Sequence, residues 1–156
     1  MKYFLVTVGK IKEPFIAAGL RLYQGRIAHY ADFQVLPVKE EKIAKGSAPP
    51  VILEREAARI LEKIPRNGVW LALDRLGTPA DSRKFFSLLT RYADQGQTRA
   101  YFIVGGPLGL APALLAKADR VLSLSPLTFT HEMSALVLTE QLYRFLTFQA
   151  GEKYHR

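Results

Sequence analysis

Apolar residues along the chain follow two alternating patterns: short unbroken runs, and longer segments with a helical period. The runs are rich in aliphatic and aromatic residues and are short enough to be strands buried on both faces. They predict strands at residues 2–8, 33–38, 69–73, 100–104 and 120–124. The periodic segments predict helices at residues 13–29, 51–64, 82–93, 112–118 and 131–148.

The regular alternation of strand and helix predicts the fold class. Such an order is typical of a three-layer α/β fold with a mostly parallel sheet. Residues 39–50 are charged and then contain Gly, Ser and Pro, which indicates a loop and not a linker between domains. Asp81 is predicted to cap the helix that follows it. We therefore expect residues 1–156 to form a single domain.

The last predicted helix is apolar on most of its sides. Only a narrow polar stripe separates residues such as Met133, Leu136, Leu142 and Phe145. A helix of this kind is buried on most sides. Two interpretations stay open from the pattern: a central core helix, or a second packing surface that a homodimer partner covers.

Composition limits the cellular compartments and the kinds of metal site that fit this chain. It has no cysteine, which excludes disulfides and thiolate metal sites and favours a reducing compartment. The apolar run at the N-terminus is too short for a signal peptide or a membrane span. No cluster of His, Asp and Glu has the spacing of metal ligands. We expect a soluble, cytoplasmic protein without a metal.

The chain is basic, with 22 Lys and Arg against 14 Asp and Glu and a formal net charge of +8. Such a charge attracts polyanions, nucleic acid above all, although it also serves solubility alone. Phosphate contacts are predicted for a set of basic side chains, each with an ordinary solvated surface as the alternative. They are Lys10, Lys12, Arg21, Arg26, Lys39, Lys42, Lys45 and Arg83.

Two loops that follow apolar strands carry the candidate chemistry. Gly105, Gly106 and Gly109 come after one strand, and because they carry no side chain their backbone can take positive φ and let a flat ligand lie against it. Their G-G-x-x-G spacing differs from the dinucleotide fingerprint and has no Walker lysine. A loop with hydroxyls at Ser125 and Thr128 follows the next strand. Together the loops predict an adenosine-type pocket at the strand ends, with a purely structural turn as the alternative.

Several segments together resemble one known family along essentially the whole chain. They are the strand and turn at residues 6–10, the strand end at 71–77, the glycine loop at 102–110, the loop at 122–131, the helix segment at 140–144 and the terminal Tyr-His-Arg at 154–156. This order and spacing is similar to that of the ribosomal RNA large subunit methyltransferase H family, which belongs to the SPOUT class. A mild departure is Thr130, where some members have proline.

The resemblance implies a fold and an activity that the residue patterns do not reveal. It implies a C-terminal trefoil knot, an obligate homodimer and S-adenosyl-L-methionine as the methyl donor. The implied reaction is methylation of N3 of pseudouridine 1915 in 23S large-subunit rRNA, on the assembled ribosome. Two alternatives stay open: a SPOUT enzyme that acts on another RNA such as tRNA, and a non-enzymatic ribosome-binding factor.

The resemblance also assigns residues to the cofactor site. Leu73 would press on the adenine and Gly105 would permit close approach, while the next loop would offer peptide groups and an apolar cradle. The implied cofactor contacts are Leu73, Gly105, Leu124, Ser125, Pro126, Leu127, Thr128 and Phe129.

Three further residues are implied to act on the target ring. From its position alone, a terminal tail of this kind is typically inert because chain ends fray. The family match instead makes His155 the proton handler, Tyr154 a group that stacks on or bonds the ring, and Arg144 a holder of phosphate or of the deprotonated ring. His131, behind a predicted Thr130 N-cap, is interpreted as structural. Asp74, just after Leu73, is noted as a candidate substrate contact but is not assigned that role.

Overall fold

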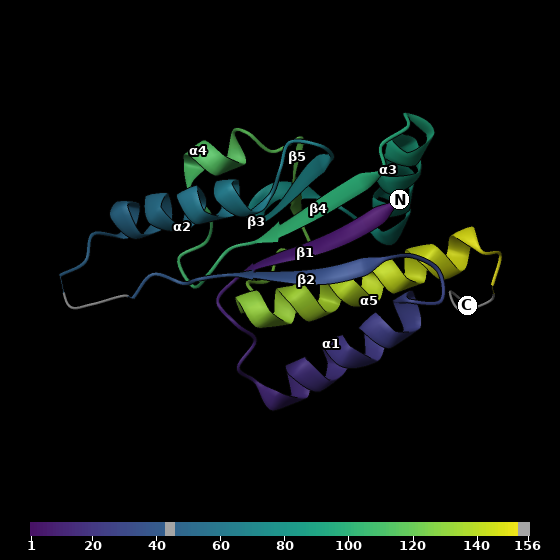
Figure 1. The fold of residues 1–156 in the computed structure, drawn as a ribbon, viewed down its shortest axis with the longest axis horizontal. Coiled ribbons are helices and arrows are strands. Elements are labelled where there is room, and N and C mark those ends of the chain that lie inside the picture. The colour runs from purple at the N-terminus through teal and green to yellow at the C-terminus, as the bar shows by residue number, and fades with distance from the viewer. Residues whose placement is uncertain (43–45, 153–156) are drawn as a thin grey trace.

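A parallel five-stranded sheet runs through the middle of the molecule (Figure 1). The computed structural model describes residues 1–42 and 46–152. The strand order is β2-β1-β4-β3-β5, and every neighbouring pair is parallel. The strands are β1 Lys2–Val8, β2 Phe33–Val38, β3 Val69–Pro79, β4 Arg99–Val104 and β5 Arg120–Ser123. This confirms the predicted α/β class with its parallel sheet.

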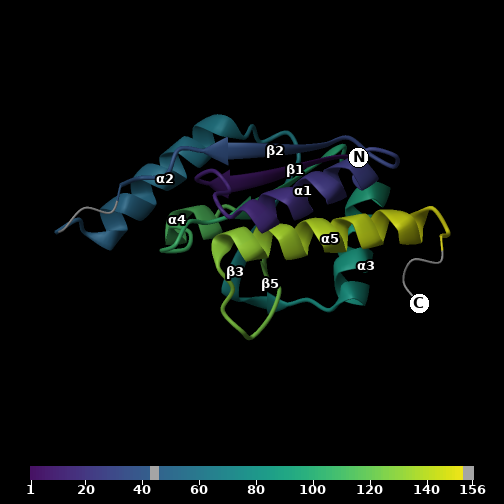
Figure 2. The same cartoon turned by 90° about the horizontal axis from the view of Figure 1, so that it is seen from below.

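Helices cover both faces of the sheet and complete three layers (Figure 1), and Figure 2 looks onto one of the two helical faces. On one face lie α1 Pro14–Ile27, α3 Ser82–Asp94 and α5 His131–Gln149, and on the other lie α2 Pro49–Lys63 and α4 Pro112–Leu115. Two separate apolar cores result. Side chains alternate along each strand, so Leu71 joins the core under α5 while Trp70 joins the core under α2.

The α5 helix packs against α1 and against strands β1 and β4 of the sheet. Ala135, Leu138, Leu142 and Phe145 are almost completely buried within this chain. The central-core interpretation therefore accounts for much of the helix's apolar character. Within residues 1–42 and 46–152, none of the helices combines the length and apolar character that a bilayer crossing requires.

Local capping signals confirm where two of the helices begin. The Asp81 carboxylate accepts the backbone N–H of Lys84 at 2.7 Å, at the start of α3. The Thr130 hydroxyl accepts the N–H of Met133 at 3.2 Å, at the start of α5. Both satisfy amides that a helix start leaves unpaired. The predicted helix ends agree with the structure to within about three residues, which is usual for such boundaries.

The prediction that the third strand ends at Leu73 is wrong. β3 continues to Pro79 after an irregularity, and both Leu73 and Thr78 pair with Leu122 of β5. Gly77 makes this path feasible because a Cβ there would lie only 2.8 Å from the Leu122 carbonyl carbon. The sequence after Leu73 is mostly polar and contains glycine and proline, which are rare in strands, but pairing with a distant strand overrides that local preference.

Candidate functional site

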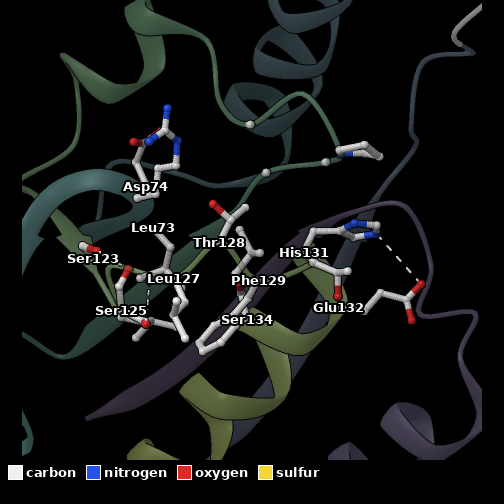
Figure 3. A pocket seen from close by; sticks show the side chains of 18 of the residues that line it. Leu73, Asp74, Ser123, Ser125, Leu127, Thr128, Phe129, His131, Glu132 and Ser134 are labelled. Carbon is white, nitrogen blue, oxygen red and sulfur yellow. Dashed lines mark hydrogen bonds and ion pairs between the residues drawn. The ribbon is translucent and has the colours of Figure 1, made fainter.

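A cavity of about 780 Å³ opens at the carboxyl ends of β3, β4 and β5 (Figure 3). Its floor consists of residues at the ends of these strands, including Leu73, Val104 and Ser123. Open α/β sheets bind ligands at this edge, and the volume is in the range of small-molecule sites. The position agrees with the pocket predicted from the two loops.

The glycine loop forms one wall of the cavity through a tight turn. The N–H of Gly109 donates to the carbonyl of Gly106 at 2.9 Å, and Gly109 has φ +88°. Of the three glycines in this loop, only Gly109 uses the positive φ that glycine permits. A Cβ at Gly105 would lie 2.3 Å from the Gly109 carbonyl oxygen. The loop's own backbone therefore requires glycine at position 105.

The loop after β5 forms the facing wall and is held by its own hydroxyls. Ser123 Oγ donates to the carbonyl of Ser125 at 3.1 Å, and Ser125 Oγ accepts the N–H of Leu127 at 2.9 Å. These serines therefore shape the loop as well as line the cavity. Leu127 is 72% exposed, so an apolar side chain stands at the rim, and Figure 3 shows it beside the cavity with Thr128 and Phe129.

The segment after Leu73 contributes charge to the same cavity. Asp74 Oδ1 accepts the N–H of Leu76 at 2.8 Å, within the irregular part of β3. Arg75 is exposed and lines the cavity, and it makes no hydrogen bond or ion pair with the residues that the structure describes. This part of β3 thus presents an available cation at the cavity mouth.

A buried acid at the start of α5 was missed by the sequence analysis. Glu132 lines the cavity, and its carboxylate accepts the N–H groups of Lys12 and Glu13 at 3.0 Å each. Burial alone would raise its pKa, but these two hydrogen bonds and the nearby His131 and Lys12 hold the pKa below its ordinary value of 4.5. The partner amides are more than a hundred residues away in sequence, so no local signal indicates the contact.

The structure gathers most of the predicted cofactor residues into this one cavity. Among the predicted set, Pro126 lies in the same loop but does not line the cavity. The lining members are Leu73, Gly105, Leu124, Ser125, Leu127, Thr128 and Phe129. His131, Asp74 and the missed Glu13 line it as well.

The predicted catalytic residues do not join the cavity within this chain. Arg144 lies three turns further along α5, where it pairs with Glu140 at 2.9 Å and borders a second cavity between α3 and α5. Tyr154 and His155 lie outside the described residues. In the part of the chain that the structure describes, no three His, Cys, Asp or Glu side chains are grouped to hold a metal ion.

Comparison with known proteins identifies the class that this sheet and cavity define. The family described as "Predicted SPOUT methyltransferase" matches residues 1–155, and the chain belongs to this family. Within it, the chain belongs with the proteins named ribosomal RNA large subunit methyltransferase H. It is 40% identical to that of Desulfotalea psychrophila over 157 residues and 38% identical to that of Halothermothrix orenii over 159 residues, with 100% of each chain covered.

A solved structure supports the fold independently of close sequence similarity. A probable methylase family protein from Haemophilus influenzae superposes with a TM-score of 0.62 at 12% identity. The match covers 99% of this chain and 70% of the other. At this identity the similarity concerns the fold alone.

Proposed function

We propose that this protein transfers a methyl group from S-adenosyl-L-methionine to N3 of a pseudouridine in large-subunit rRNA, position 1915 of 23S rRNA, on the assembled ribosome. The names of its full-length relatives support methylation of large-subunit rRNA. The observation that carries the proposal is the cavity itself. Seven of the eight residues that the family resemblance assigns to the cofactor line one ligand-sized space at the strand ends.

The residues present fit the proposed cofactor. Leu73 and Phe129 offer apolar surface for an adenine, while Gly105 and Gly106 bring main-chain groups to the cavity with no side chain of their own. S-adenosyl-L-methionine, when bound, supplies an activated methyl group on its sulfonium. The protein's own task is then to place the nucleobase in line with that methyl group and to remove one proton.

Removal of the N3 proton is assigned to the C-terminal tail and to Arg144. The N3–H of a uracil-type ring is weakly acidic and is largely retained at neutral pH. We propose that His155 receives or relays this proton and that Tyr154 stacks on or bonds the ring. Arg144 would stabilise the negative charge that the ring acquires, or hold a neighbouring phosphate.

Chain geometry supports a homodimer in which the tail of one subunit serves its partner. The cavity lies at the start of α5, whereas Glu152 lies beyond its end, where it accepts a hydrogen bond from the Tyr30 hydroxyl at 2.8 Å. The 19 residues of α5 span about 28 Å. The four residues after Glu152 reach about 14 Å at most when fully extended. A tail that acts at a cofactor cavity therefore has to act at the partner's.

We also propose the trefoil knot that the resemblance implies. The extension of β3 supports it, since Leu73 and Thr78 both pair with Leu122 and the register between the two strands shifts at this point. The close approach of Gly77 to the Leu122 backbone fits a chain that wraps tightly around another segment.

A methylation assay on ribosomal subunits tests the proposed function. Purified protein and labelled S-adenosyl-L-methionine should methylate large subunits from a deletion strain, and mass spectrometry should place the methyl group on the pseudouridine. Methylation of tRNA with unmodified subunits would favour the SPOUT enzyme with another RNA target. Failure to bind the cofactor at millimolar concentration in calorimetry would favour the non-enzymatic ribosome-binding factor.

A further inference from the structure

One buried side chain connects two distant parts of the chain beside the cavity. Glu132 is 6% exposed, and its two carboxylate oxygens accept separate hydrogen bonds, Oε1 from the N–H of Lys12 and Oε2 from the N–H of Glu13, both at 3.0 Å. Residues 9–13 connect β1 to α1, whereas Glu132 is the second residue of α5. A carboxylate with two backbone donors is strongly held because the bonds are charge-assisted.

The connected segment reaches the cavity at Glu13. Glu13 lines the cavity on one side of this contact, and His131, Glu132 and Ser134 line it on the other. Glu13 is the N-cap residue of α1, but its own side chain makes no capping hydrogen bond. The Lys12 side chain is directed to the surface, where it pairs with Glu40 at 2.8 Å. At the cavity, the position of the segment therefore depends on Glu132.

We propose that Glu132 is a positioning residue that fixes the backbone of Lys12 and Glu13 and thereby places Glu13 at the cofactor cavity. The inference rests on the proposed function, since it assigns the cavity to S-adenosyl-L-methionine. Glutamine should replace Glu132 only in part, because its amide oxygen accepts one N–H while its NH₂ group faces the other donor. Alanine leaves both N–H groups without this acceptor.

Calorimetric titration with S-adenosyl-L-methionine tests the proposal on the full-length protein. We expect Glu132→Ala to weaken binding about tenfold and Glu132→Gln about threefold. In methylation assays the KM for the cofactor should rise accordingly, with the KM for ribosomal subunits unchanged and kcat at saturating cofactor within about twofold of wild type. A role in stability alone would not separate the two KM values.

Asp81→Ala provides a matched control. It removes the N-cap bond of α3, which lies outside the cavity, and should lower the melting temperature without changing cofactor affinity. If Asp81→Ala weakened cofactor binding as much as Glu132→Ala, a general loss of stability would explain the result and the positioning role would be rejected.

A second variant removes a donor and leaves the acceptor intact. Glu13 has φ −69°, which proline adopts, so Glu13→Pro deletes the N–H with little backbone change. We expect it to weaken cofactor binding about threefold relative to Glu13→Ala, which keeps the N–H. The effects of Glu13→Pro and Glu132→Gln should not add in the double variant.

The outcomes separate this inference from the proposed function. Wild-type protein that fails to bind the cofactor would refute both. Wild-type protein that binds, together with Glu132→Ala and Glu13→Pro variants that bind equally well, would refute the positioning role alone.

Discussion

At the scale of single residues, the glycine loop shows why one side chain is excluded. A Cβ at Gly105 would overlap the Gly109 carbonyl oxygen, so the constraint comes from the loop before any ligand is considered. The sequence analysis attributed this glycine to ligand approach. The family resemblance assigned Gly105 to the cofactor, and that role stays a prediction; the structure shows that Gly105 lines the cavity and that the turn itself leaves no room for a Cβ.

We predict that Gly105→Val abolishes cofactor binding by displacing the glycine loop. Affinity should fall at least tenfold in calorimetry because the loop is rebuilt around the new side chain. Gly25→Ala is the control, since nothing lies within 4 Å of a Cβ at this α1 position. It should keep full affinity and raise the free energy of unfolding by about 0.5–1 kcal/mol. Unchanged binding by Gly105→Val would contradict the assigned cavity.

Arg75 is predicted to contact a phosphate of the substrate RNA. The Arg75→Ala variant should bind large subunits about three- to tenfold more weakly, and the slope of log affinity against log salt should decrease by about one. Cofactor affinity should not change. Arg120→Ala removes the same charge at the start of β5, away from the cavity, and should leave RNA binding nearly unaltered. Equal losses for the two variants would indicate a general charge effect.

At the scale of elements, the strands were predictable because most are apolar and buried on both faces. The β3 extension was not, because its residues are polar and its partner is 44 residues further along, as the pairing of Thr78 with Leu122 shows. The Glu132 contact was missed for the same reason. Local periodicity reports on burial, and it carries no information on which distant backbone a segment meets.

Replacement of Gly77 should disrupt the pairing between the β3 extension and β5. We expect Gly77→Val to lower the free energy of unfolding by about 3 kcal/mol in urea titrations, since the new side chain overlaps the Leu122 backbone. Leu76→Ala, at a neighbouring position that is 79% exposed, should change it by less than about 0.5 kcal/mol. A stable Gly77→Val protein would show that the two strands separate readily.

The stability that Glu132 contributes by connecting α5 to the segment before α1 should depend on pH. The pKa of Glu132 is lowered on folding, so its contribution to stability is complete above its ordinary pKa of 4.5 and is lost as the pH falls through the lowered value. The difference in unfolding free energy between wild type and Glu132→Gln should therefore shrink below pH 4.5. A difference that stays constant down to pH 3 would mean that folding does not lower the pKa of Glu132.

At the scale of the whole molecule, the α/β class followed from the order of elements. The knot came from the family resemblance alone, because default topology rules disfavour knots. The homodimer was implied by the resemblance and was one of two interpretations of the last helix, and burial within this chain accounts for much of the apolar character of that helix. The tail was likewise chosen by resemblance, and its chemistry stays a prediction. What the structure adds is the position of the cavity at the start of α5.

Subunit mixing tests whether the tail acts across a dimer. A protein that lacks residues 154–156 should bind cofactor normally but transfer no methyl group. Gly105→Val should be inactive as well. Refolded together, the two should recover activity, because one mixed site combines an intact cavity with an intact tail. Recovery of less than a few per cent of wild-type turnover would place the tail and cavity of one site on the same chain.

The length of α5 carries a constraint on how this protein can change. The helix sets the distance between the cavity at its start and the C-terminal tail after its end. Each inserted residue would shift the start of the tail by about 1.5 Å and rotate it by about 100° about the helix axis. Gly151, with φ +74°, ends the helix at a fixed place. Insertions and deletions should therefore be tolerated in surface loops of this chain and penalised within residues 131–149, even where every replaced side chain faces solvent.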